Sequence, residues 1–213
     1  MTDIPSTPAS GPGRPKDPAK REAILDAAKR LFILHGYEGS SMDAIAAEAG
    51  VSKLTLYSHF ASKENLFAAA VASKCQEQLP PLFFERTDEV PLEQVLLDVG
   101  RRFHQLIHSE ESVAMHRLMI AQGAQNPQLS QQFFNAGPQR LLDAMQQLLE
   151  RADRKGQLRV ADPLRAADHF FSMLKGACHL LLLIGACSAP QGDEAEAEVR
   201  DVVRLFLRAY ARD

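Results

Sequence analysis

The sequence has no tryptophan and only three cysteines, and the number and spacing of the cysteines limit the class of protein that it can belong to. Cys75, Cys178 and Cys187 are an odd number, lie far apart and form no C-x-x-C pair, so they predict reduced thiols rather than a disulfide framework. The longest apolar run, ACHLLLLIGAC, is shorter than the roughly 20 residues that a transmembrane helix needs. No basic-then-apolar leader is present at the N-terminus. We therefore expect a cytoplasmic protein with no membrane partner.

Motifs for chemistry are also missing. The sequence contains no nucleophile elbow, no phosphate-binding loop and no paired carboxylates, so we expect no enzyme and no cofactor. His104 and His108 have the four-residue spacing of a two-histidine metal clamp, but no cysteine or carboxylate at a matched spacing completes it, and we assign no metal site. Metal sensing by these histidines and redox sensing by Cys178 and Cys187 remain minor alternatives.

Strand-like alternation is absent, and helical periodicity is present throughout. The four N-terminal segments are expected at 18–35, 42–49, 53–60 and 63–78, with Ser41, Ser52 and Ser62 as N-caps. Gly36 ends the first segment, and Gly50 ends the second. Longer amphipathic helices are expected at 91–108, 110–123, 127–136, 138–155, 163–185 and 193–211. The sequence predicts an all-α fold in which a disordered tail (1–13) precedes an N-terminal three-helix helix-turn-helix domain (14–75) and a C-terminal helical bundle (76–213).

Residues 42–60 have the pattern of a helix-turn-helix. Ala46 is small where the two helices would cross, Gly50 permits the turn, and Leu56 and Phe60 bury one side of the second helix. The exposed residues of that helix would enter the major groove of DNA and read bases, namely Lys53, Leu54, Thr55 and Ser58. Four further residues could bind phosphates, namely Ser41, Tyr57, His59 and Lys63. For Tyr57 and His59 the alternative is that they only fill the space between helices.

The stretch REAILDAAKRLFILHGYEGSSMDAIAAEAGVSKLTLYSHFASKENLF, with its flanks at about 14–70, resembles the TetR/AcrR family of transcriptional regulators. The resemblance implies the same groove-reading and phosphate-binding positions. Leu54 departs from the family pattern, which often has glycine there, and Ala44 stands where an acidic residue often completes the cap. The short GRPK segment is similar to the arms that place an arginine, here Arg14, in a minor groove, although a solvated tail is the alternative.

The resemblance also implies an inducer pocket and a homodimer interface in residues 76–213. Methionine, phenylalanine and histidine side chains from several helices are the candidate ligand-binding residues, although the same spacing also suits a plain core: Phe103, His104, Met115, Met119, Phe133, Phe134, Met145, Phe170 and Met173. His116 and Gln122 are further polar groups that could orient a ligand.

The last two helices are the candidate dimer interface. The segment HFFSMLKGACHLLLLIG is apolar around most of its circumference, and the final helix has one apolar stripe. The candidate residues are Gly176, Leu180, Val199, Val202, Val203, Phe206 and Tyr210, with an ordinary monomer core as the alternative.

The expected function is that of a sequence-specific DNA-binding regulator. By resemblance, a homodimeric repressor would bind a palindromic double-stranded DNA operator and would be released by a small apolar or amphipathic inducer. Residues 63–79 would transmit the change, because they join the two domains. The rivals are a DNA-binding protein without a ligand, and a small-molecule-binding or catalytic helical protein whose N-terminal unit binds other proteins.

Overall fold

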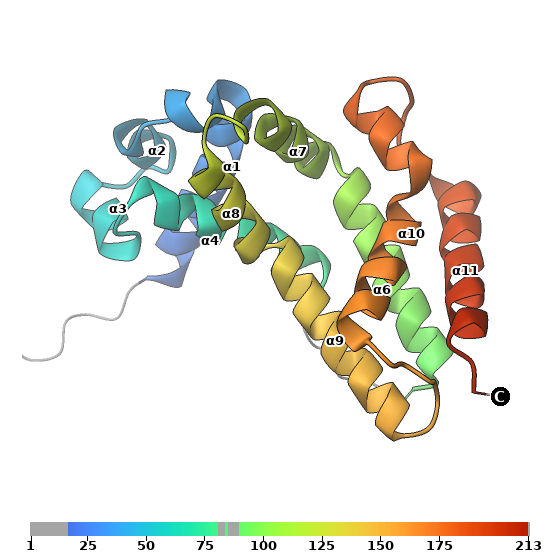
Figure 1. Ribbon diagram of the computed structural model, residues 1–213. Coiled ribbons are helices and arrows are strands. Elements are labelled where there is room, and N and C mark those ends of the chain that lie inside the picture. The colour runs from blue at the N-terminus through green and yellow to red at the C-terminus, as the bar shows by residue number, and fades with distance from the viewer. Residues whose placement is uncertain (1–16, 81–83, 85–89, 213) are drawn as a thin grey trace, which may run out of the picture.

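The computed structural model describes residues 17–80, 84 and 90–212, and every regular element in these ranges is a helix, which confirms the all-α prediction (Figure 1). The helices are α1 (Pro18–Gly39), α2 (Met42–Glu48), α3 (Lys53–His59), α4 (Lys63–Gln78), α6 (Leu92–His108), α7 (Glu110–Gln122), α8 (Pro127–Ala136), α9 (Pro138–Arg154), α10 (Pro163–Leu183) and α11 (Gly192–Ala209). The expected tail at 1–13 and Arg14 lie outside the described residues.

Local side-chain chemistry sets the ends of the N-terminal helices. The hydroxyl oxygens of Ser41, Ser52 and Ser62 accept hydrogen bonds from backbone N–H groups three residues later, at 3.1 to 3.2 Å, so each serine is the N-cap that the sequence predicts. Gly50 has a φ of +66°, which glycine adopts without strain, and it supplies the turn between α2 and α3.

Two glycines interrupt longer helices. Gly36 has a φ of +73° inside α1, so the helix breaks at the predicted residue before a last short turn. Gly176 has a φ of +53° inside α10, where the sequence predicts an uninterrupted helix. Among the described residues, nothing beyond the local backbone lies within 4 Å of the position that a Cβ at Gly176 would take, so no other helix crosses α10 closely there. Gly176 therefore divides α10 into two segments.

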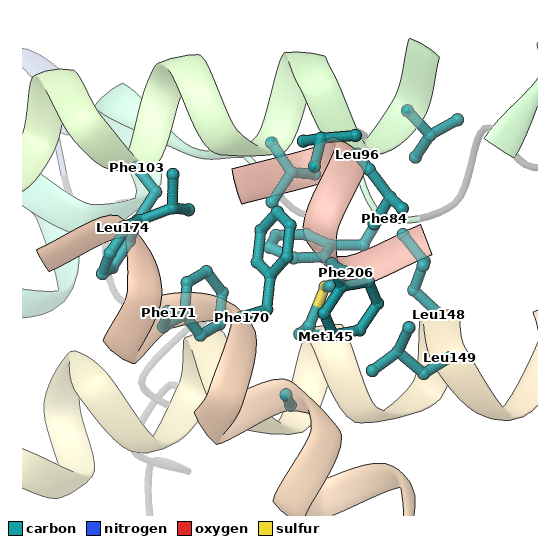
Figure 2. Close-up of a cluster of buried hydrophobic side chains, with 14 of the residues drawn as sticks. Phe84, Leu96, Phe103, Met145, Leu148, Leu149, Phe170, Phe171, Leu174 and Phe206 are labelled. Atoms are coloured by element: carbon teal, nitrogen blue, oxygen red, sulfur yellow. The ribbon is translucent and has the colours of Figure 1, made fainter. Parts of the chain in front are cut away.

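The C-terminal core lies among α6, α9, α10 and α11, which run side by side in Figure 1. Figure 2 shows its aromatic and aliphatic side chains meeting between these helices, with Phe170 and Phe206 in edge-to-face contact at 5.2 Å between ring centroids. Met145 and Leu148 on α9 are completely buried in the same cluster.

The N-terminal core is not closed by the first four helices alone. Phe32, Phe67 and Leu56 form its centre, and Met119 from α7 and Leu129 from α8 complete it. Figure 1 shows α7 and α8 lying between the N-terminal helices and the C-terminal bundle. The DNA-binding unit expected at 14–75 thus shares its core with residues from later in the chain.

Within the ranges described, no helix combines the length and apolar character needed to cross a bilayer.

Candidate DNA-binding surface and ligand cavity

The exposed face of α3 has the mixed chemistry that base reading requires. Leu56 is buried and attaches the helix to the N-terminal core, whereas Leu54 is 82% exposed. Lys53 and Ser58 are also exposed, and Thr55 is half-buried with Oγ1 2.9 Å from the Ser52 hydroxyl. The structure therefore brings the four predicted groove-reading residues onto one short helix and leaves Leu54 without an intramolecular packing role.

Lys53 is joined to the preceding helix. Its Nζ lies 2.8 Å from an oxygen of Asp43 at the start of α2, and this hydrogen-bonded ion pair raises the pKa of Lys53. Both side chains are largely exposed, so the pair contributes little stability. The ammonium can therefore exchange Asp43 for a base or phosphate of DNA at small cost.

The predicted phosphate-binding residues have different surroundings. Tyr57 is 42% exposed, and Ser41 is exposed at the N-terminus of α2, where its hydroxyl oxygen accepts a backbone hydrogen bond and its proton stays available. His59 is half-buried beside the ring of Phe60, so both of its predicted interpretations stay open.

Lys63 lies against α1 rather than extending from the surface. Its Nζ donates to the Tyr37 carbonyl at 2.9 Å, lies 4.3 Å from the centre of the Tyr37 ring and is 3.9 Å from Glu38. A cation in this place interacts favourably with the carbonyl end of α1. Lys63 thus joins α4 to α1, and a phosphate contact would compete with these interactions.

A partly open cavity of about 160 Å³ lies where the N-terminal helices meet the C-terminal bundle. Side chains from α1, α4, α6, α7, α8, α9 and α10 line it. Four predicted ligand-binding residues are among them, Phe103, Met115, Phe133 and Phe134, and so is His116. The sequence reasoning missed the contribution of α1 and α4, because no local pattern distinguishes a helix that lines a cavity from one that only supports a DNA-binding unit.

The other five predicted ligand-binding residues lie elsewhere. Met145 and Phe170 are fully buried in the C-terminal core, and Met119 belongs to the N-terminal core. Met173 is on the surface of α10. His104 faces α11, where its Nε2 lies 3.1 Å from Glu198. This distribution differs from the expectation because methionine and phenylalanine at helical spacing serve ordinary cores as well as ligand sites.

The charges that line the cavity near α1 and α4 are paired. Lys29 on α1 bonds Glu77 on α4 at 2.8 Å and lies 3.1 Å from Asp26. Lys74 on α4 forms an ion pair with Glu111 on α7. These pairs hold the helices together, and the three carboxylates leave neither lysine as an unpaired positive charge on this side of the cavity.

A row of four histidines runs from the cavity toward α11. The ring of His116 contacts His179, which contacts His108, which contacts His104, with centroid distances of 5.3, 5.8 and 4.1 Å. Burial and, to a smaller extent, the neighbouring rings lower the pKa of His108 and of His179 to about 4, and burial also lowers the pKa of His116. Among the described residues no group of histidine, cysteine, aspartate or glutamate has the geometry of a metal site.

The expected dimer stripe on α11 faces inward. Val199, Val203 and Phe206 are buried in the protomer's own core, because α11 has a single apolar stripe and α6 covers it. Val202 and Tyr210 are half-buried at the edge of the same core. These residues have little surface left to offer a partner in this conformation.

In the last two helices and the residue that follows α10, several large apolar side chains are exposed. Leu180, Leu181 and Ile184 are 62%, 42% and 68% exposed, and Leu205 on α11 is also exposed. Leu180 and Leu181 lie after Gly176 in the second segment of α10, and Ile184 is the C-cap of that helix. We call these four residues the α10–α11 apolar face. Leu180 is the one strongly exposed apolar side chain among the residues predicted for the interface.

Comparisons with known proteins agree with this architecture. Residues 24–70 match the model of bacterial regulatory proteins of the tetR family, and residues 94–212 match the AefR-like transcriptional repressor C-terminal domain. The regulator SrpR of Pseudomonas putida is 28% identical over 171 residues, which cover 80% of this chain and 77% of SrpR.

Two solved structures are similar over almost the whole chain. A TetR-family regulator from Mesorhizobium loti has a TM-score of 0.74 and 29% identity, covering 91% of this chain and 98% of that one. The flavonoid-responsive regulator FrrA has a TM-score of 0.68 and 32% identity over the same shares. The described helices, the exposed face of α3 and these matches lead to one conclusion: the chain belongs to the TetR family of DNA-binding transcriptional regulators.

Proposed function

We propose that this protein is a homodimeric repressor that leaves a palindromic operator when a small apolar or amphipathic inducer fills the cavity. The observation that carries the proposal is the position of the cavity. Ala70, Val71, Lys74 and Cys75 of α4 form one of its walls, and the same helix supports α1 in the N-terminal core. A molecule in the cavity would thus contact the helix that supports the DNA-binding unit.

Tight packing around α4 favours transmission of the signal. A Cβ at Gly137, between α8 and α9, would lie 3.1 Å from Val71 and from Cys75, so the backbone at this junction is already close to α4. Packed helices resist compression. The displacement caused by a bound ligand would therefore move α4 as a whole rather than be taken up by small shifts of the side chains beside the cavity. A ligand that binds the shifted form more tightly moves the population toward it, and the two α3 helices of a dimer then no longer match the operator spacing.

The α10–α11 apolar face is the proposed dimer contact. Leu180 and Ile184 are large and strongly exposed, and burying them against the same residues of a second copy obeys two-fold symmetry. The face is at the opposite end of the molecule from α3 in Figure 1, so two copies joined there would leave both α3 helices free. A two-fold dimer accounts for a palindromic operator.

The inducer is proposed to be largely apolar because phenylalanine, methionine and aliphatic side chains dominate the cavity. FrrA is named as flavonoid-responsive, which supports a ring-containing ligand for this chain as well. The cavity also argues against the rival of a DNA-binding protein without a ligand, which needs no such space.

The test is the binding of purified protein to duplexes from DNA flanking its own coding region, by fluorescence anisotropy at two salt concentrations. We expect dimeric, sequence-dependent binding. Lys53→Ala should alter the preference among sequences, whereas Arg165→Ala removes the same charge from the exposed start of α10 and should not. Binding that is weak, identical on all sequences and abolished by salt, or no binding at all, would contradict the proposal.

A further inference from the structure

The cavity contains one polar group whose hydrogen-bonding state is fixed by the structure. Nδ1 of His116 lies 2.7 Å from the backbone carbonyl oxygen of Ser112, one turn earlier on α7. A carbonyl only accepts hydrogen bonds, so Nδ1 must carry the proton. Burial lowers the pKa of His116, which keeps the ring neutral near pH 7. The second nitrogen, Nε2, is then a bare acceptor, and among the described residues no hydrogen bond joins it to a partner.

The surroundings of His116 are aromatic. Its ring meets Phe133 edge to face at 5.5 Å, and Phe103, Phe134 and Phe171 line the same cavity. Aromatic side chains favour offset and edge-to-face contacts with another ring. The volume of about 160 Å³ is comparable to the engineered cavity of about 150 Å³ that holds a benzene molecule. A long acyl chain would require the helices to separate.

The charges favour a neutral molecule. Lys29 and Lys74 are neutralised by carboxylates, as described above. Lys175 and Asp168 also line the cavity, but both are exposed and have opposite charges. An anion that reached the aromatic interior would be desolvated, at a cost of several kcal/mol, and among the described residues the one lining lysine outside an ion pair, Lys175, is exposed at the rim where solvent screens its charge.

We propose that the inducer is a phenol: one benzene-sized ring among Phe103, Phe133 and Phe171, with its hydroxyl donating a hydrogen bond to Nε2 of His116. This inference rests on the proposed function, because it identifies the ligand of the same cavity. The hydroxyl supplies the donor that Nε2 of His116 lacks, and the phenol needs no counter-ion. Larger phenols would place their remaining parts toward the exposed side of the cavity near Lys175.

The proposal is tested with three probes of similar size by ligand-observed NMR at pH 7.5 on the full-length protein. These are 4-methylphenol, 4-methylanisole, which lacks the donor, and 4-methylbenzoate, which is an anion. Because a hydrogen bond contributes about 0.5–1.5 kcal/mol net, we expect 4-methylphenol to bind about three- to tenfold more tightly than 4-methylanisole. The benzoate should bind more weakly than the phenol.

Two variants locate the effect. His116→Phe keeps a ring of similar size but removes the acceptor, and it should bind the phenol and the anisole equally. His116→Gln keeps an acceptor and should retain part of the preference. Lys175→Ala is the matched control at the rim, and it should leave the phenol affinity unchanged. A preference that survives His116→Phe would assign the hydroxyl to another group and overturn the inference.

The same samples separate this inference from the proposed function. Operator binding is measured on each variant without a probe, and it should be unchanged by His116→Phe. Release of the operator by 4-methylphenol at a concentration about three- to tenfold lower than that required of 4-methylanisole supports the inference. Intact operator binding with no phenol binding, or preferred binding of 4-methylbenzoate that is lost in Lys175→Ala, overturns the phenol alone. Absence of operator binding by the wild-type protein, measured without a probe, overturns the proposed function.

Discussion

The buried histidines make a quantitative prediction about stability and pH. Both ring nitrogens of His108 and Nδ1 of His179 are buried without a hydrogen-bond partner among the described residues. Burial, the largest cause, and the charges of neighbouring groups, which are His104 for His108 and His116, His108 and Lys175 for His179, together lower the pKa of each from the ordinary 6.5 to about 4. Glu198 acts in the opposite direction on His108 only.

The direction in which stability changes with pH follows from proton linkage. When the pKa is lower in the folded state, the unfolded chain binds more protons between about pH 6.5 and pH 4, so acidification favours unfolding in that window. Stability is lost as the pH falls from about 6.5 to about 4, and these two groups add no further loss below it. Lowering the pH from 7 to 5 should cost about 2 kcal/mol for each histidine. Glu196, whose pKa hydrogen bonds from Arg101 and Arg200 lower to about 2, titrates below this window.

Urea unfolding followed by circular dichroism measures the effect at pH 7.0, 6.0 and 5.0, with the protein concentration fixed because a dimer's stability depends on it. The double variant His108→Leu/His179→Leu should lose most of the difference between pH 7 and pH 5, whatever its absolute stability. His35→Gln replaces an exposed histidine on α1 and should keep the wild-type difference. An unchanged pH dependence in the double variant would refute the reasoning.

Three further predictions follow from single contacts. Gly100→Ala should lower the free energy of unfolding by about 1–3 kcal/mol in urea titrations, since the new Cβ would lie 2.9 Å from Val199 in the core. An unchanged urea midpoint would show that α11 can move away from the new methyl group without loss of stability. Leu180→Asp should convert the dimer to a monomer in light-scattering measurements, and a persistent dimer would place the interface elsewhere. Ser52→Ala should cost about 1 kcal/mol and weaken operator binding, because Thr55 loses its cap; equal affinity would contradict a role for cap rigidity.

The sequence predicted the local structure well because the interactions that set it are local. The serine N-caps and the turn at Gly50 depend on residues within three or four positions, and α8 begins and ends where its proline and glycine flanks indicate. The exposed face of α3 could also be predicted, since Leu56 and Phe60 identify the buried side of a helix of only two turns.

The cavity and the dimer face could not be predicted to the same extent, because they depend on which helices become neighbours. The apolar stripe of α11 has the predicted period, but a period does not say whether α6 of the same chain or a second copy covers it. Met145 and Met115 are alike in the sequence, yet one lies in the core and the other lines the cavity. The histidine row brings together four residues from three helices, and only the spacing of His104 and His108 was visible beforehand.

The shared N-terminal core has a consequence for the construction of chimeric sensors. Met119 and Leu129 complete the cluster around Phe32 and Phe67, although they follow the end of α3 by 60 and 70 residues. A graft of residues 17–78 onto a foreign sensing bundle would leave this apolar surface uncovered. A functional chimera would need to include the α7–α8 segment together with the first four helices, so that the transferred DNA-binding unit keeps the residues that complete its core.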